Sequence, residues 1–330
     1  MSGGQLDIHF SFWLIFIIIV CVMLYIDLYV TDHSHHERSL KSSAVWSCIW
    51  IGVALLFNAS LYLLYDNGHE KAMEFLACYL VEKSLSVDNL FVFIMIFQAL
   101  NIKRINQPHI LKWGILGAIV FRVIFILFGI GLIEHFKVTI CVFGLILLYA
   151  AFKMLKDALS DEEQTFDLNK SRIIKFIDKT FKIDTAYTGE RFFTKIDGKA
   201  ALTPLFVALI VIETADIVFA TDSIPAVLAI SHDPFIVITS NIMAVLGLRA
   251  LYFVLSGMLG MFKYLKHGVA LILFFVGFKM MIMYLCDEFM YFCAYKISVG
   301  VSLGIIFVTL TLSVILSIIM RKRDQGENIT

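Results

Sequence analysis

Two long apolar stretches of the chain are interrupted by side chains that offer oxygen ligands. The first includes EKSLSVDNLFVF, residues 82–93, and the second includes ETADIVFATDS, residues 213–223. Their acidic and small polar members are Glu82, Asp88, Asn89, Glu213, Asp216, Asp222 and Ser223. Carboxylate, amide and hydroxyl oxygens suit Mn²⁺, Ca²⁺ or Mg²⁺ better than Cu⁺ or Zn²⁺. The same acids could bind protons, so a metal path and a proton path each account for them.

A charged side chain at the centre of a bilayer costs at least about 2.5–3.5 kcal/mol, so these acids need partners. The basic residues within the apolar runs are Lys83, Arg122, Arg249 and Lys279. They could simply hold the helices together, although Ser, Thr and Asn do so at smaller cost. We favour a site in which Asp88 and Asp222 are central metal ligands, the other acids are co-ligands or proton carriers, and the arginines neutralise them when no metal is bound. Asp27, near the inner end of a span, and Asn241, as an interhelical hydrogen-bond group, are weaker candidates.

The composition is that of a membrane protein. Hydrophobic residues make up 60% of the 330 residues and charged residues 16%, with a mean hydropathy of +0.86, whereas soluble domains average about 45–50% apolar and about 25% charged. Basic and acidic residues number 27 each, so the net charge gives no sign of a nucleic-acid partner, and none is expected. The six cysteines are scattered without a CxxC pair or metal-ligand spacing, which favours small buried thiols.

Apolar runs near 20 residues predict nine transmembrane helices in an all-α, polytopic membrane fold. The predicted spans are 11–31, 44–65, 72–100, 112–133, 136–156, 202–230, 234–258, 265–285 and 296–320. If the N-terminus is outside, the outer loops hold only Lys71, Lys137 and Lys296, and the inner loops hold the other loop Lys and Arg residues. The positive-inside rule therefore predicts an outer N-terminus and an inner C-terminus. The polar segment 157–201 is predicted to be a cytoplasmic linker along the membrane surface.

The two acidic stretches align as parts of an internal repeat. The aligned pairs are Glu82 with Asp216, Asp88 with Asp222, Asn89 with Ser223, Arg122 with Arg249, and Lys153 with Lys279. Because each copy would contain three spans, the second copy enters the membrane from the opposite side, which predicts the inverted repeat of many secondary transporters. The predicted divisions are residues 1–71 for two N-terminal helices, 72–156 for the first repeat, 157–201 for the linker, 202–285 for the second repeat, and 286–330 for the last helix and a basic tail. Lys83 aligns with Ile217 and is therefore not repeated.

Pro225 predicts an interruption in the sixth span. It lacks an N–H group for the carbonyl of Thr221 and crowds that carbonyl, so we expect a kink or break near ATDSIP. A break would free backbone carbonyls and let Glu213, Asp216 and Asp222 turn toward one cavity. Symmetry predicts an interruption in the third span as well, although no Gly or Pro lies between Lys71 and Leu100.

Four stretches of the sequence strongly resemble the TerC integral membrane family: YLVEKSLSVDNLFVF, VIETADIVFATDSIPAVLAI, DPFIVITSNIMAVLGLRALYF and GFKMM. YIDLYV and SLKSSAVWSCIWIGVALLFN resemble its Alx-like branch. The resemblance implies a multi-pass protein of the bacterial inner membrane that takes part in metal-ion homeostasis, with manganese export as the activity and tellurite resistance as the source of the family name. It also implies that the two acidic stretches form the site.

The sequence thus favours a divalent metal cation transporter, with manganese efflux first, an acidic site between the repeats, and exchange for protons as an option that fits equally well. Its expected partners are the metal ion as substrate, protons and the lipid bilayer, with no permanently bound cofactor. The main alternative is a membrane scaffold or assembly factor in a metal or tellurite stress-response complex. No enzymatic activity is expected, because an intramembrane aspartyl protease would need glycine-flanked aspartates within its spans, and neither Asp88 nor Asp222 is next to a glycine.

Overall fold

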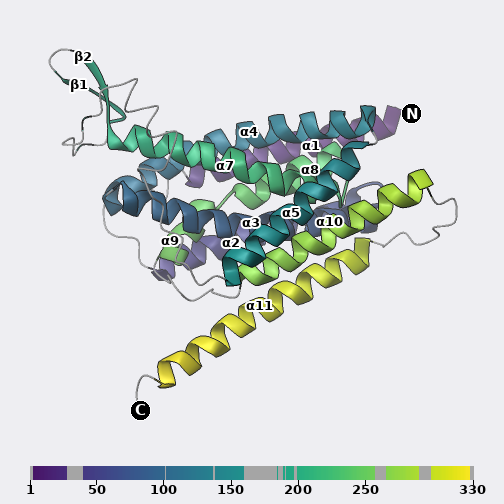
Figure 1. The fold of residues 1–330 in the computed structure, drawn as a ribbon. Helices are drawn as coiled ribbons and strands as arrows, with labels where there is room; N and C mark the ends of the chain where they lie inside the picture. Colours follow the sequence, from purple (N-terminus) through teal and green to yellow (C-terminus); the bar gives the residue numbers. More distant parts are fainter. Residues whose placement is uncertain are drawn as a thin grey trace.

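The computed structural model describes residues 3–27, 40–100, 102–136, 138–159, 184, 189, 191–196, 199–256, 265–289 and 299–327. Within these ranges, the side chains of Asp88 and Asp222 are among a few that lie outside the described part of the structure. The described chain is a bundle of long helices with a small hairpin at one end (Figure 1).

The helices follow the order of the predicted spans. They are α1 (Gly3–Tyr25), α2 (Leu40–Leu64), α3 (Gly68–Ala99), the 3₁₀ turn η2 (Arg104–Asn106), α4 (Gln107–His135), α5 (Val138–Leu159), α7 (Pro204–Leu228), α8 (Pro234–Val245), α9 (Leu248–Ser256), α10 (Leu265–Phe289) and α11 (Val299–Glu327). Among the described residues, four helical segments are long and apolar enough to cross a membrane, and the bent pair α8–α9 makes a fifth. The prediction of a polytopic helical membrane protein is confirmed at this level.

The interruption predicted at Pro225 is absent, because α7 runs unbroken from Pro204 to Leu228. Pro225 lies in the last turn of α7, and because it has no N–H group the helix continues through it at the cost of the hydrogen bond to the carbonyl of Thr221. The third span is also continuous, as α3. The break falls instead in the seventh span, where α8 and α9 meet at 41° across residues 246–247. Gly247 has a φ of +81°, a conformation that glycine adopts without steric penalty.

The innermost helices are α3 and α8. Residues Phe235–Val245 of α8 are all buried, and α3 packs against α2, α7, α8 and α11. The helix α4 packs against α7, and α5 packs along α10. The close approach of α5 and α10 depends on small residues, because a Cβ atom on Gly277 would lie 3.0 Å from the carbonyl oxygen of Gly144. These contacts bring the first and second predicted repeats together.

The linker contains an antiparallel β-hairpin, which corrects the all-α prediction locally. The strands β1 (Phe193–Ile196) and β2 (Lys199–Leu202) pair with Ile196 opposite Lys199. The intervening sequence is Asp197–Gly198, a dipeptide that favours two-residue hairpin turns. Residues 160–183 of the predicted linker lie outside the described residues. Thr203 joins the hairpin to α7, since its hydroxyl donates to the carbonyl oxygen of Arg191 at 2.9 Å.

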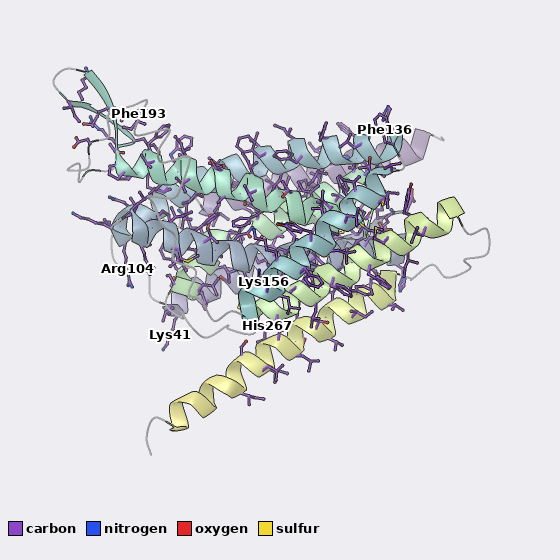
Figure 2. All side chains as sticks on the ribbon, viewed as in Figure 1. Lys41, Arg104, Phe136, Lys156, Phe193 and His267 are labelled. Atoms are coloured by element: carbon purple, nitrogen blue, oxygen red, sulfur yellow. The ribbon has the colours of Figure 1, made fainter. Side chains whose placement is uncertain are left out.

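The two ends of the bundle carry different residues. Lys41 and Arg104 lie toward the same end as Phe193 of the hairpin, and Phe136 lies at the opposite end (Figure 2). At the hairpin end, the hydroxyl of Tyr252 donates to the side-chain oxygen of Gln107 at 2.9 Å, which ties the end of the seventh span to the start of α4. This hydrogen bond joins two helix ends that the predicted topology assigns to the same side of the membrane.

Candidate functional site

Arg122 of α4 stands between two carboxylates in the interior of the bundle. Its Nη1 donates to Glu82 of α3, and its Nη2 and Nε donate to the two carboxylate oxygens of Asp216 of α7 at 3.0 and 3.3 Å. Arg122 is 1% exposed and Glu82 is fully buried. The forked contact with Asp216 is the geometry that makes arginine–carboxylate pairs strong. Two acids share one guanidinium, so these three side chains retain one excess negative charge when all are ionised.

Two neutral groups complete the hydrogen bonding of Glu82. The side-chain nitrogen of Asn241 in α8 donates to Oε2 of Glu82 at 2.9 Å, and the hydroxyl of Ser86 donates to Oε1 at 3.3 Å. Arg122 also donates to the side-chain oxygen of Asn241 at 3.4 Å. The polar cluster of Glu82, Ser86, Arg122, Asp216 and Asn241 therefore joins α3, α4, α7 and α8.

Apolar cores enclose this polar cluster on both sides. Along α4, Arg122 lies between Ala118, which belongs to one buried core, and Ile126, which belongs to the other. Along α7, Asp216 lies between Ile212 and Ala220 in the same way. Water is scarce in such a position, so charges interact strongly there and unpaired charges are costly.

Glu213 lies one turn from Asp216 on α7 and has a different environment. Its Oε2 is buried without a hydrogen-bond partner among the described residues. Its carboxylate lies against Gly117 of α4, where a Cβ atom would be 2.1 Å from Oε1 of Glu213 and would displace the carboxylate. The hydroxyl of Ser223 is likewise buried without a partner in the described part of the chain.

The remaining predicted basic residues lie outside the polar cluster. Arg249, fully buried at the start of α9, pairs with Asp27 beyond the end of α1 at 3.3 Å. Lys279 of α10 donates to the hydroxyl of Ser302 in α11 at 3.2 Å. Lys83 donates to the backbone carbonyl oxygen of Ala244 at 3.0 Å.

Three predicted ligands remain to be placed. Asn89 is buried in α3, and the backbones of Asp88 and Asp222 lie in α3 and α7, but their side chains are outside the described structure. Among the described residues, no three His, Cys, Asp or Glu side chains lie close enough to hold a metal ion. The described geometry is therefore a pair of acids, Glu82 and Asp216, that both bind Arg122. Metal binding by the seven predicted ligands stays a prediction.

A second charged cluster, at the Phe136 end of the bundle, was not predicted from the sequence. Lys71 bridges Glu74 of α3 and Asp233 at 3.1 Å each, and Ser231 donates to Glu74 at 2.7 Å. Glu74 precedes Glu82 by eight residues, so the two carboxylates project within about 80° of each other around α3. This spacing of Glu74 from Glu82 was the sequence signal from which the second charged cluster could have been predicted. Partial burial, and then the charge of Asp233, raise the pKa of nearby Tyr65 above its usual range.

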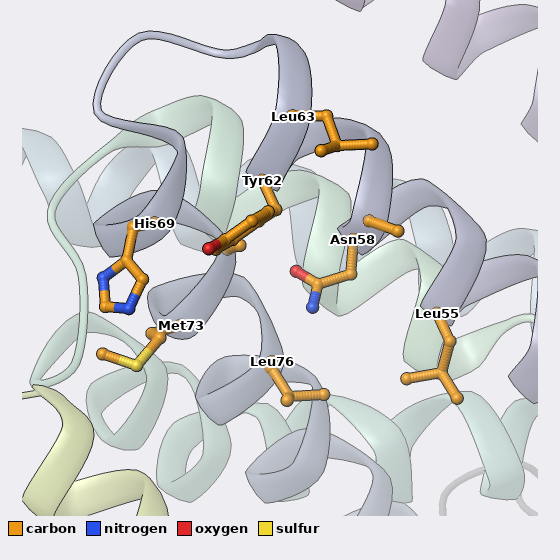
Figure 3. A pocket seen from close by; sticks show the side chains of 9 residues that line it. Leu55, Asn58, Tyr62, Leu63, His69, Met73 and Leu76 are labelled. Atoms are coloured by element: carbon orange, nitrogen blue, oxygen red, sulfur yellow. The ribbon is translucent and has the colours of Figure 1, made fainter.

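A surface pocket of about 460 Å³ opens between α2 and the start of α3. Figure 3 shows Asn58, Tyr62 and His69 among its otherwise mainly apolar lining residues. None of the predicted acids lines it, so it is separate from the polar cluster.

Comparisons with known proteins identify the family. The family model of the integral membrane protein TerC family matches residues 67–325. The chain is 40% identical over 312 residues to a protein of Salmonella typhi named putative membrane-bound redox modulator Alx, with 92% of this chain and 93% of that protein covered. It is 39% identical over 312 residues to the protein of the same name from Escherichia coli K12, with the same coverage. It is 40% identical over 270 residues to the uncharacterized membrane protein STKORF319 of Myxococcus xanthus, with 82% of this chain and 83% of that protein covered.

No solved structure matches the chain significantly. The family match extends over most of the chain and confirms the resemblance seen in the sequence, while α1 and α2 precede the matched region. The chain belongs to the integral membrane protein TerC family.

Proposed function

We propose that this protein carries a divalent metal cation, with Mn²⁺ as the first candidate, through a site between α3, α4, α7 and α8. The supporting observation is the guanidinium of Arg122, a cation held between the buried carboxylates of Glu82 and Asp216. Ionisable groups at this depth in a membrane protein are expensive and usually mark a substrate or ion path. In this proposal Arg122 neutralises the acids of the empty site, and a metal ion displaces it.

The proposed ligands are hard oxygen donors. The proposed ligand set consists of the carboxylates of Glu82 and Asp216 together with the predicted ligands Asp88, Asp222, Asn89 and Ser223. Such a set suits Mn²⁺, Mg²⁺ or Ca²⁺. Glu213 lies one turn from Asp216 with an unpartnered oxygen, which fits a group that binds a proton or joins the metal as a further ligand.

Helix packing supports an inverted repeat around this site. A two-fold axis between two three-helix units requires that, where the first helix of one unit packs on the second helix of the other, the converse contact also forms. Here α3 packs on α8 and α4 packs on α7, while the two third helices, α5 and α10, pack together. Transporters built this way alternate access by moving one unit against the other around a fixed site. The grouping of Lys41 and Arg104 at the hairpin end supports an inner location for that end (Figure 2).

The proposal extends to location and direction. All three relatives described above come from bacteria, and we propose that this chain lies in a bacterial inner membrane and exports the metal in exchange for protons. The name of the Alx relatives points to redox modulation as another role. The described cysteines Cys21, Cys48, Cys78 and Cys141 are free thiols. We favour metal transport over redox modulation because Arg122, a cation, bridges the carboxylates of Glu82 and Asp216.

Reconstituted transport tests the proposal. Proteoliposomes loaded with Mn²⁺ should release it in a protein-dependent manner, faster with an opposing pH gradient, and Asp216→Asn and Asp88→Asn should abolish release while the protein stays folded. A metal series of Mn²⁺, Mg²⁺, Ca²⁺ and Zn²⁺ fixes the substrate. Metal binding to the purified protein that Asp88→Asn leaves unchanged, together with no transport, would instead favour the scaffold or assembly role.

A further inference from the structure

The break between α8 and α9 leaves backbone carbonyls without helical partners. The last hydrogen bond of α8 runs from the N–H of Leu246 to the carbonyl of Ile242, and the chain then turns at Gly247. The carbonyls of residues 243–245 therefore lie beyond the last intrahelical bond and form the negative end of the helix dipole. Inside a membrane protein such groups need a partner, because water is not there to supply one.

Lys83 supplies a positive charge at this end. Its ammonium group lies 3.0 Å from the carbonyl oxygen of Ala244 and is partly buried. Lys83 follows Glu82, which accepts a hydrogen bond from Asn241, three residues before Ala244 on α8. The ammonium is thus a second internal cation, bound to backbone oxygen next to the polar cluster in which Arg122 is bound to carboxylates.

The repeat explains why only one half of the chain has such a lysine. The span that corresponds to α8 and α9 is α4, which runs unbroken from Gln107 to His135 and frees no carbonyls in its middle. The residue aligned with Lys83 is Ile217 on α7. A lysine occurs where the facing helix is broken, and an isoleucine occurs where the facing helix is continuous.

The break is a fixed feature of the fold. Trp50 of α2 packs so closely on Gly247 that a Cβ atom there would lie 2.5 Å from the indole ring. Arg249, two residues further on, is paired with Asp27. The contacts of Trp50 and Asp27 thus fix the chain at residues 247–249, directly after α8. The carbonyl end of α8 is therefore formed before any cation binds there.

We propose that the carbonyl end of α8 is a monovalent-cation site that the ammonium group of Lys83 occupies. In transporters with broken helices, half-helix C-terminal ends and unwound carbonyls coordinate Na⁺ or H⁺. Here the chain supplies that cation itself. Removal of the ammonium group should therefore open the site to a small monovalent cation from solution, either NH₄⁺ or Na⁺.

Thermal unfolding tests the site without reference to transport. Purified wild type and Lys83→Ala are unfolded in equal concentrations of ammonium chloride, sodium chloride and choline chloride. We expect ammonium or sodium to raise the unfolding temperature of Lys83→Ala by several degrees over choline, and the wild type to unfold at one temperature in all three. Preference for ammonium or for sodium identifies the cation chemistry. Equal unfolding temperatures of Lys83→Ala in the three salts would overturn the proposal.

Control variants separate the site from a general salt effect. Lys153→Ala removes an exposed lysine of α5 and should respond to the salts as the wild type does. Lys83→Met keeps an apolar side chain in place of the ammonium group and should stay indifferent to the cations. If Lys83→Ala does not fold, Lys83→Ser provides the same measurement, and its indifference to all three salts would overturn the proposal equally.

The transport consequence rests on the proposed function. Lys83→Ala should carry metal about tenfold more slowly than wild type in choline chloride, because a charged hydrogen bond is lost. Ammonium or sodium chloride should raise the transport rate of Lys83→Ala several-fold. Lys83→Met should stay slow in every salt. A wild type that carries no metal refutes the proposed function, whereas the salt effect on the unfolding of Lys83→Ala still decides the cation site.

Discussion

Replacement of Arg122 by methionine is the sharpest perturbation of the polar cluster. Methionine is unbranched, uncharged and shorter than arginine, so Arg122→Met removes the only described cation between the carboxylates of Glu82 and Asp216. Both carboxylates are buried, and the two apolar cores on either side leave them little access to water. Removal of one partner from a buried ion pair destabilises a protein by about 3–5 kcal/mol, because an uncompensated charge remains.

A double-mutant cycle measures the interaction energy between Arg122 and Asp216. Asp216→Asn alone removes one carboxylate and leaves Arg122 with Glu82. The double variant Arg122→Met with Asp216→Asn leaves only Glu82 charged, and Asn241 and Ser86 still donate to it. We expect the double variant to be less destabilised than the sum of the single variants, by about 1–3 kcal/mol.

The assay is unfolding by denaturant in detergent micelles, with and without Mn²⁺. If the acids form the metal site, Mn²⁺ stabilises Arg122→Met more than it stabilises the wild type, in which the guanidinium competes for the same oxygens. In Arg122→Met with Asp216→Asn the metal should give little stabilisation. Additive single variants, or an equal Mn²⁺ effect on wild type and Arg122→Met, would refute the reasoning.

Three further predictions address the surroundings of the cluster. Gly117→Ala should displace the carboxylate of Glu213, which would be 2.1 Å from the new Cβ atom, and slow metal transport without changing any charge. Gly247→Ala should destabilise the protein by about 1–2 kcal/mol from its left-handed backbone alone, and by more because a tryptophan ring lies 2.5 Å from the Cβ position. Asp27→Asn should destabilise the protein by about 3 kcal/mol, because Arg249 is fully buried and loses its charged partner. Transport rates and denaturant midpoints check all three.

Two glycines with open surroundings serve as controls. A Cβ atom on Gly131, in the same helix as Gly117, or on Gly52 of α2 would meet nothing within 4 Å. Alanine at these positions should leave transport and stability close to those of wild type. Gly117→Ala with unchanged transport would show that the position of Glu213 does not matter. Gly247→Ala that is as stable as Gly52→Ala would show that the break is less constrained than its φ angle indicates.

The sequence predicted the helical membrane fold and the two acidic stretches, because long apolar runs and buried charges have few alternative explanations. It did not predict the site of the helix break. Proline is the strongest local signal for an interruption, but α7 continues through Pro225 to its end at Leu228. The observed break depends on Gly247 and on Trp50 packed against it, a contact between helices far apart in the sequence. Local sequence patterns do not contain such contacts.

The pairing of the two arginines with the predicted acids was right for Arg122 and wrong for Arg249. The alignment makes Arg122 and Arg249 equivalent, and symmetry alone would place each near an acid of the other half. Arg122 meets that expectation through Asp216, whereas Arg249 pairs with Asp27, from the N-terminal part of the chain that lies outside the repeat. A prediction based on the repeat cannot include a partner that the repeat does not contain.

This departure from symmetry has a consequence for cation binding. With Arg122 as the only described guanidinium in the polar cluster, Glu82 and Asp216 keep one excess negative charge to attract a cation. A second arginine there would cancel that excess, and two guanidinium groups would have to be displaced before a metal ion could bind. Asp27 compensates the charge of Arg249 elsewhere. The segment that carries Asp27 precedes the region matched by the family model, so a residue outside that region contributes to the charge balance of the proposed cation site.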